Sequence, residues 1–335
     1  MSLRFDHKKG LLSLLATLAT LTAMPSLAQS TNAWPTKPIK IIVGYSAGGA
    51  TDVLTRLVSV SMGNTLGQSI VVENRPGAGG TLGTTLASKA KPDGYTLFLG
   101  QVASHGVTPN LYKKLEYDPV KDFTPLGLIA SSPQVVVVNP SSPIKSIKDL
   151  VEFSKANSGK MTYASSGVGT TIHLAGEMYN NQVNVKMVHV PFQGSGPAIT
   201  AMLGNQANVM FDDLPSAMPQ IKSGGLRAIA VTGAERSPQL PDVPTVKEVG
   251  APFNLGQFEV SAWFALFGPA KLPDSIADSL NKTLDQVLND PEVKEFFAGR
   301  GSVVMPGTRK QAAEFVNAEL AKWGTVIREG KIELQ

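Results

Sequence analysis

The sequence predicts an α/β fold built from parallel strands that are joined by right-handed helical crossovers. Short apolar runs alternate with amphipathic helical stretches, and glycine-rich loops follow several of these runs. With 335 residues, of which 42% are hydrophobic and 17% are charged, the chain is long enough for two ordinary domains with full-sized cores. The same composition excludes collagen, a coiled coil and wholesale disorder.

The first predicted unit is a strand at 39–43, a loop at 44–49 and an amphipathic helix at 51–66. The run of four valines at 135–138 is typical of a parallel strand buried on both faces. The other expected strands lie at 69–73, 95–100, 161–164, 185–191, 209–211, 226–231 and 262–267. The other expected helices reach to about residue 90 and to about residue 180, or lie at 148–156, 197–203, 214–222, 275–288, 291–298 and 310–329.

Two strand–loop–helix units, at 41–58 and 161–179, share one design and predict two domains whose helix N-termini face a common cleft. Stretches rich in proline and serine, at 131–142 and 237–252, are the candidate boundaries. A chain that crosses to a second domain and returns has two linkers, which can act as a hinge. The expected division is a first domain of 29–131 with 250–335, and a second domain of 132–249.

Residues 1–28 match a secretory signal peptide and do not belong to the predicted fold. Three basic residues precede an apolar run of 13 residues at 11–23, and Ser26-Leu27-Ala28 offers small residues for cleavage near Ala28. This run is too short to span a bilayer comfortably, and no later segment has 18 uninterrupted apolar residues. We therefore expect export to the periplasm.

Charge and cysteine content exclude several classes of protein. Removing three basic residues and one acidic residue with the signal peptide leaves 27 and 25, so the formal net charge falls from +4 to +2. This surplus is too small for a nucleic-acid-binding protein. With no cysteine there is no disulfide scaffold, thiol nucleophile or lipid-modified cysteine anchor. The four histidines lack metal-ligand spacing and no nucleotide motif is complete, so neither a metal nor a cofactor is expected.

The loop Gly44-Tyr45-Ser46-Ala47-Gly48 matches the G-x-S-x-G pattern of serine hydrolases. In that fold several strands and an oxyanion loop precede the serine, whereas here a single strand precedes Ser46. Anion binding is a second interpretation, because glycines let a ligand approach the backbone and the following helix start offers free N–H groups. A plain tight turn capped by Thr51 is the third. We expect a binding protein and not an enzyme.

Two further loops have the same character. The stretch from Ser165 to Thr171 is rich in hydroxyl groups and glycine, and it leads to His173, which more often would be a structural hydrogen-bonding residue than a ligand contact. The stretch 191–197 precedes another helix, for which Pro197 suits the first position. Amides and hydroxyls without fixed charge suit an oxygen-rich ligand that is neutral or anionic.

Two acidic sites complicate this interpretation. Asp52, in the first turn of a helix, competes with an anionic ligand for the same amides; it either caps the helix or holds an ammonium or hydroxyl group of the ligand. Asp212 and Asp213 are adjacent at a strand end and point to opposite sides, so they are not expected to act as an acid–base pair.

A series of short motifs runs along the mature chain. They are WPTKPI at 34–39, GYSAGGATD at 44–52, ENRPGAGG at 73–80, KPDGYT at 91–96, LYKKL at 111–115, HVPF at 189–192, GSGPA at 194–198, MFD at 210–212 and LPDVPT at 240–245. In combination they resemble the periplasmic receptors of tripartite tricarboxylate transporters, often called Bug proteins. One position departs from the pattern, because Thr108 stands where members often carry asparagine.

The resemblance implies a two-lobed periplasmic binding protein fold, type II-like, with two α/β domains joined by a two-strand hinge. It implies a receptor that closes on a mono-, di- or tricarboxylate, held largely by amides, hydroxyls and bridging water, and that docks transiently on a membrane permease. A receptor that feeds a sensor stays open as an alternative. The chain itself is expected to be a monomer that binds no nucleic acid.

The residues expected to contact the ligand lie in the loops described above and in a segment near residue 105. They are Tyr45, Ser46, Ala47, Gly48, Gly49, Thr51, Asp52, Ser104, His105, Ser165, Ser166, Gly167, Gly169, Thr170, Thr171, Phe192, Gly194 and Asp212.

Overall fold

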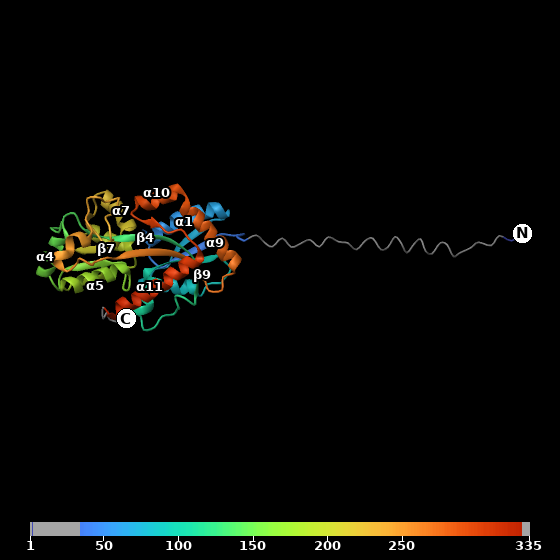
Figure 1. Ribbon diagram of the computed structural model, residues 1–335, viewed down its shortest axis with the longest axis horizontal. Coiled ribbons are helices and arrows are strands. Elements are labelled where there is room, and N and C mark those ends of the chain that lie inside the picture. The colour runs from blue at the N-terminus through green and yellow to red at the C-terminus, as the bar shows by residue number, and fades with distance from the viewer. Residues whose placement is uncertain (1, 3–33, 330–335) are drawn as a thin grey trace.

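The computed structural model describes residue 2 and residues 34–329, and it confirms the predicted α/β fold. Helices cover a mixed sheet whose main path runs β2-β1-β3-β9-β4-β7-β5-β6, with β8 and β10 pairing with β4 off this path (Figure 1). The predicted signal peptide at 1–28 lies outside the described residues, apart from residue 2.

The strands agree with the predicted ones within a few residues, apart from β4 and β10. They are β1 (Ile39–Val43), β2 (Ile70–Asn74), β3 (Thr96–Gln101), β4 (Phe123–Val138), β5 (Thr162–Ser165), β6 (Val188–Pro191), β7 (Val209–Asp213), β8 (Arg227–Val231), β9 (Ser261–Pro269) and β10 (Val303–Val304).

The helices also agree, and the structure adds short ones that the sequence analysis did not predict. The helices are α1 (Ala50–Leu66), α2 (Thr81–Ser88), α3 (Thr108–Leu111), α4 (Ile147–Ala156), α5 (Thr171–Val183), α6 (Ser195–Leu203), α7 (Leu214–Lys222), α8 (Val246–Gly250), α9 (Asp274–Asn289), α10 (Pro291–Gly299) and α11 (Arg309–Glu329). Short turns are η1 (Ala78–Gly80), η2 (Ala103–Val107) and η3 (Ala251–Phe253).

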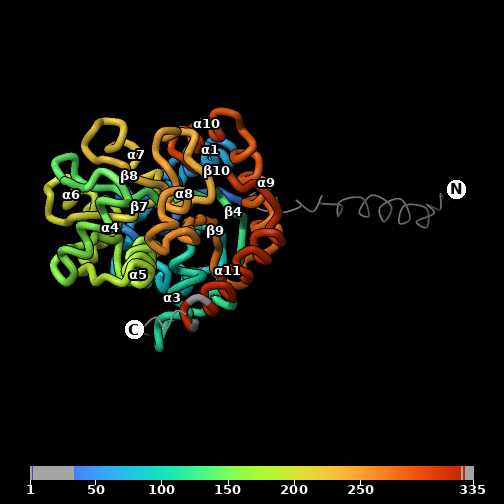
Figure 2. The backbone as a smooth tube through the Cα atoms, turned by 60° about the vertical axis from the view of Figure 1, so that its left-hand side comes forward, coloured from blue at the N-terminus to red at the C-terminus, as the bar shows by residue number. Residues whose placement is uncertain are grey.

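Strand β4 is long and belongs to two parts of the molecule. Its residues 123–133 pair with β9, whereas its last residues pair with β7 on one side and β8 on the other. We call β1, β2, β3, β9 and β10 with α1–α3 and α9–α11 the first half, and β5–β8 with α4–α8 the second half. Figures 1 and 2 show the two halves side by side, with β4 running between them.

The prediction that the valines at 135–138 form a parallel strand was wrong. These residues pair antiparallel with β7 and β8. They are nevertheless buried on both faces, because Val136 and Val138 pack into one apolar cluster of the second half while Val135 and Val137 pack into the other. Parallel pairing is confined to β1 with β2 and β3, and to β5 with β6 and β7, among the described strands.

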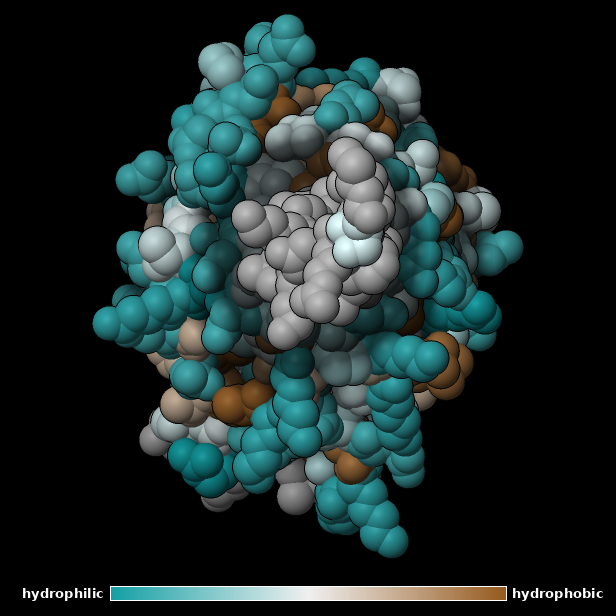
Figure 3. Space-filling model, turned by 90° about the vertical axis from the view of Figure 1, so that its right-hand side faces the viewer, coloured by the Kyte–Doolittle hydropathy of each residue, from teal (hydrophilic) through white to brown (hydrophobic). Residues whose placement is uncertain are grey.

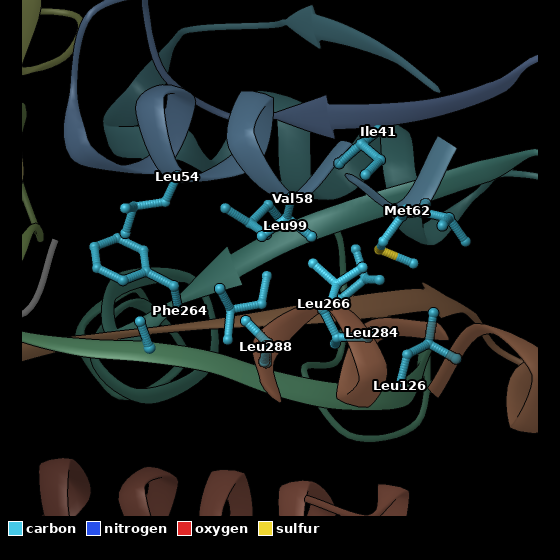
Figure 4. Packing of buried hydrophobic residues seen from close by; sticks show 14 of the residues in the cluster. Ile41, Leu54, Val58, Met62, Leu99, Leu126, Phe264, Leu266, Leu284 and Leu288 are labelled. Carbon is cyan, nitrogen blue, oxygen red and sulfur yellow. The ribbon is translucent and has the colours of Figure 1, made fainter. Parts of the chain in front are cut away.

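Each half has its own core. In the first half, one face of α1 packs through Leu54, Val58 and Met62 onto the sheet, and α9 adds Leu284 and Leu288 (Figure 4). Burying a side chain of this size contributes about 1.5–3 kcal/mol. Helix α1 then ends at Gly67, whose φ of 66° is the left-handed conformation that glycine adopts readily. Both halves are therefore scaffolds that hold their loops in place.

On the face shown in Figure 3, hydrophilic side chains dominate and hydrophobic ones form only small, separate groups. None of the helices among residues 34–329 is long and apolar enough to cross a membrane.

Candidate functional site

The loop between β1 and α1 is bonded to both halves. The buried phenol of Tyr45 donates a hydrogen bond of 2.9 Å to the carbonyl of Gly79 within the first half. The amide and the Oγ of Ser46 donate to the carbonyl oxygen of Gln193 in the second half, at 2.9 and 2.8 Å. This loop, which the sequence predicts as part of the site, therefore lies where the halves touch.

Asp52, in the first turn of α1, is buried and bonded on both oxygens. Its carboxylate accepts from the amide of Gly48 at 3.0 Å, from Nδ2 of Asn74 at 3.0 Å and from Nε of Arg56 at 3.1 Å. Burial raises the pKa of this carboxyl, but the bonds from Arg56, Gly48 and Asn74 outweigh burial and hold the pKa below its usual value. Asp52 thus fixes its own loop, and the amide of Gly48 is already engaged.

The first turns of α1 and α5 retain backbone amides that have no hydrogen-bond partner among the described residues. In α1 these are the amides of Ala50, Thr51 and Asp52, and in α5 those of Thr171 and Ile172. The N-terminus of a helix carries a partial positive charge, which favours an anion beside these amides.

The loop between β5 and α5 is held by hydroxyl groups, without an ion pair in the described structure. The Oγ of Ser165 accepts from the amide of Gly167 at 3.1 Å and lies 2.6 Å from Nε2 of His189. Thr170 donates to the Gly167 carbonyl at 2.7 Å and, as the N-cap of α5, accepts from the amide of His173 at 3.3 Å. The predicted residues Ser165, Ser166, Gly167, Gly169, Thr170 and Thr171 are all buried.

The halves meet through glycines that leave no room for a side chain. A methyl group built at Gly79 would lie 2.1 Å from the carbonyl oxygen of Val168. One built at Gly196 would lie 2.3 Å from the carbonyl oxygen of Ala47. The backbones of the three loops are therefore in direct contact.

The structure brings most of the predicted site residues together at this junction. They are Tyr45, Ser46, Ala47, Gly48, Gly49, Thr51 and Asp52 of the first half, with Ser165, Ser166, Gly167, Gly169, Thr170, Thr171, Phe192 and Gly194 of the second half.

His105 lies in the core of the first half and not among the loops. Its ring stacks on Phe267 with 3.9 Å between ring centroids, and its Nδ1 lies 2.9 Å from the Oγ of Ser104. Complete burial lowers the pKa of His105 to about 3, so the ring is neutral. The hydroxyl of Thr108, in contrast, borders the second half, 3.5 Å from a methyl group built at Gly169.

Asp212, predicted as a ligand contact, is fully buried in a structural network. Its two oxygens accept from the hydroxyls of Ser195 at 2.6 Å and Ser216 at 2.7 Å, which joins the starts of α6 and α7. Burial raises the pKa of Asp212 to about 6, although both serine hydroxyls lower it. We therefore assign Asp212 to the scaffold.

Asp213 is a candidate that the sequence analysis did not include. It lies opposite Gln134 in the pairing of β7 with β4, and the Nε2 of Gln134 is 3.4 Å from its Oδ1. Burial, together with the charge of Asp212, raises the pKa of Asp213 to about 7. The pKa of Tyr45 is raised chiefly by burial; Gln101 lowers it, and the nearby carboxyl of Asp213 raises it. The opposite orientation of the two acids was the available sequence signal.

Ser46 has no histidine partner in the described structure. Its Oγ is bonded to Gln193, and the three described histidines bond elsewhere: His105 to Ser104, His173 to the amide of Gly169, and His189 to Ser165. No group of acidic and histidine residues that could hold a metal ion occurs within residues 34–329.

Comparison with known proteins identifies the family. A family model described as "Tripartite tricarboxylate transporter family receptor" matches residues 54–332. The protein BugT of Bordetella pertussis is 33% identical over 325 residues, which are 96% of this chain and 98% of BugT. The resemblance to Bug proteins is confirmed.

Two solved structures from Rhodopseudomonas palustris extend the match to the fold. Rpa4515, solved with adipate, is 31% identical with a TM-score of 0.86, and the match covers 90% of this chain and 100% of that one. MatC, solved with bound malate, is 33% identical with a TM-score of 0.82, covering 88% and 99%. The predicted periplasmic binding protein fold is thereby confirmed, and the chain belongs to the receptor family of tripartite tricarboxylate transporters.

Proposed function

We propose that the mature protein is a periplasmic receptor that closes on a small carboxylate and delivers it to a tripartite tricarboxylate-type permease. The observation that carries this proposal is the position of the unpartnered amides of α1 and α5, which start from loops of opposite halves that meet at one junction. Each helix start contributes about 0.3–1 kcal/mol to holding an anion, and up to about 2 kcal/mol when partly buried. The relatives solved with adipate and malate support the ligand class.

We infer that the two halves are the two lobes expected from the sequence, with β4 and the segment before β9 as the hinge strands. The first predicted boundary, at 131–132, falls within β4. For the second crossing we propose residues 260–261 in place of 249–250. Leu255, Phe258 and Val260 pack into a core of the second half, which supports this shift.

We infer further that the protein is a monomeric receptor without catalytic activity, exported by its predicted signal peptide and cleaved near Ala28. The bonding of Ser46 to a carbonyl, and not to a histidine, supports the absence of a hydrolase. Delivery to a sensor in place of a permease is the alternative, and co-purification of the membrane partner distinguishes the two.

The proposal is tested by thermal unfolding of the purified mature protein against a panel of aliphatic and aromatic acids. A ligand that binds only the native state raises the melting temperature by mass action. We expect at least one acid to bind with a Kd of roughly 1 μM, about −8 kcal/mol. If no acid in the panel shifts the melting temperature, the receptor function is wrong.

A pair of glycine variants tests whether closure of the junction is needed for that binding. Gly79→Ala introduces a methyl group that clashes with Val168, whereas Gly67→Ala has the same left-handed φ (66° against 62°) and nothing within 4 Å of the added methyl group. Both variants bear a similar backbone cost, about 1–2 kcal/mol. We expect only Gly79→Ala to lose affinity for the acid. Equal affinity in the two variants would contradict closure at this point.

A further inference from the structure

An excess of hydrogen-bond acceptors surrounds Asp213 at the junction. Asp213 is 5% exposed and Gln134 is fully buried. The single bond between them, from Nε2 of Gln134 to Oδ1 of Asp213, is long at 3.4 Å. The Oε1 of Gln134 is buried and has no hydrogen-bond partner within the described part of the chain. A buried acceptor left without a donor costs about 1–3 kcal/mol, so this arrangement suits a ligand that supplies the donor.

No cation balances this group. The titratable neighbours that influence Asp213 and Tyr45 are Asp212 on the same strand, Tyr45 itself from the loop after β1, and Tyr112 behind Tyr45. Tyr45 donates its proton to Gly79, so its oxygen faces the junction only as an acceptor. Among residues 34–329, no lysine, arginine or histidine forms an ion pair or hydrogen bond with Asp213.

We propose that Asp213 and Gln134 receive a protonated amino group, so that the ligand of this receptor is an amino-substituted carboxylate. The inference rests on the proposed function, which supplies the carboxylate end of the ligand. An ammonium group has three donors, and the junction offers the Asp213 carboxylate, the Gln134 carbonyl and the Tyr45 oxygen as acceptors. A hydroxyl group supplies one donor but leaves the charge of Asp213 uncompensated. The cation therefore fits this environment better than the hydroxyl group.

Matched acids of equal length test the proposal by calorimetry at pH 8. The series are propionate, lactate and alanine; succinate, malate and aspartate; and adipate with 2-aminoadipate. In the series that binds, we expect the amino member to bind about tenfold or more tightly than the unsubstituted acid, with the hydroxy acid between them. An unsubstituted acid that binds as tightly as its amino counterpart overturns the inference and leaves the receptor function standing. Absence of binding in every series and across the broader acid panel removes both proposals.

The variant Asp213→Asn assigns the effect to this residue. It keeps the shape of the side chain, and we expect it to bind the amino acid about tenfold more weakly while its affinity for the unsubstituted acid stays the same or rises. The control is Glu152→Gln, an acid on the exposed surface of α4, which should change neither affinity. Thermal unfolding first verifies that both variants are folded. Equal loss for both kinds of acid in Asp213→Asn would refute the assignment.

The pH dependence of the wild-type affinity gives a second measurement that needs no variant. Protons and the ligand ammonium compete for Asp213, whose pKa is raised to about 7, so affinity for the amino acid should increase from pH 6 to pH 8. Asp212 and Tyr45, the facing groups, add no positive charge that would reverse this slope. Affinity that instead falls as the pH rises would show that Asp213 donates a proton to an acidic ligand, and would overturn the inference.

Discussion

Two strand-to-helix junctions of this protein carry buried acids, and their environments differ. After β1, Asp52 is bonded to Arg56, Asn74 and the amide of Gly48. After β7, Asp213 has one long bond to Gln134 and lies beside a second acid. The pKa of Asp52 lies below its usual value, whereas the pKa of Asp213 lies above it.

The difference shows that burial alone does not decide the charge of an acid at a helix start. Both acids are about 5% exposed or less. The partner groups decide, because Arg56 neutralises Asp52 within its own helix while nothing in the described structure neutralises Asp213. The first junction is therefore a fixed support, and the second holds a group whose charge responds to pH and, in our proposal, to the ligand.

The largest stability effect should come from removing the support of the first junction. Asp52→Ala leaves the amide of Gly48 and the buried side of Asn74 without an acceptor, and we expect a loss of about 2–3 kcal/mol in the free energy of unfolding at pH 7. Because the folded pKa of Asp52 is lowered, its contribution is complete above the unfolded value and is lost as the pH falls through the folded pKa. Urea unfolding at pH 7 and pH 3 measures both.

A matched control separates the ion pair from the loop bond in that measurement. In α4, Asp149 accepts from the amide of Lys145 at 2.9 Å, four residues earlier, as Asp52 does from Gly48, but no arginine is bonded to it. Asp149→Ala should cost only about 1 kcal/mol. Equal costs for the two substitutions would contradict the role assigned to Arg56 and Asn74.

The second junction should respond with the opposite sign. A carboxyl whose folded pKa is about 7 and whose unfolded pKa is near 3.8 destabilises the fold when it is ionised, and this cost grows as the pH rises between those values. In ligand-free protein, Asp213→Asn should therefore raise the free energy of unfolding by about 1–3 kcal/mol at pH 8 and by almost nothing at pH 4. A variant less stable than the wild type at pH 8 would contradict the unpaired state of Asp213.

Much of this comparison was predictable from local sequence patterns. The strands and helices around both junctions, including β1, α1, β7 and α7, agree with the prediction within two residues, because hydrophobic periodicity and glycine positions are local signals. The first twelve residues of β4 were not predicted. Pro125, Gly127 and Pro133 interrupt the pattern there, and β4 pairs with β9 across register shifts that only the tertiary structure defines.

The site was predictable as a set of loops but not as a set of contacts. The glycine and hydroxyl content of 44–49 and 165–171 correctly indicated loops that the structure brings to one junction. No sequence pattern places Gln134 opposite Asp213, since 79 residues separate them and the pairing arises from the antiparallel contact of β4 with β7. Nor does spacing reveal that Asp212 is turned toward Ser195 and Ser216, or that His105 stacks in the core.

The smallest effect should come from loosening the second junction without removing its acids. Ser195→Ala deletes one of two serine bonds to Asp212 and should cost about 1 kcal/mol at pH 8, because Ser216 still bonds the carboxyl. That serine lowers the pKa of Asp212, so the cost should shrink at pH 4, where the carboxyl is protonated in both proteins. Ser154→Ala, which removes a buried hydroxyl bonded to neutral Val151 and Tyr179, should cost a similar amount at both pH values. If the cost of Ser195→Ala is equally independent of pH, then Asp212 is already neutral at pH 8, and the acids of the second junction differ from Asp52 more than we infer.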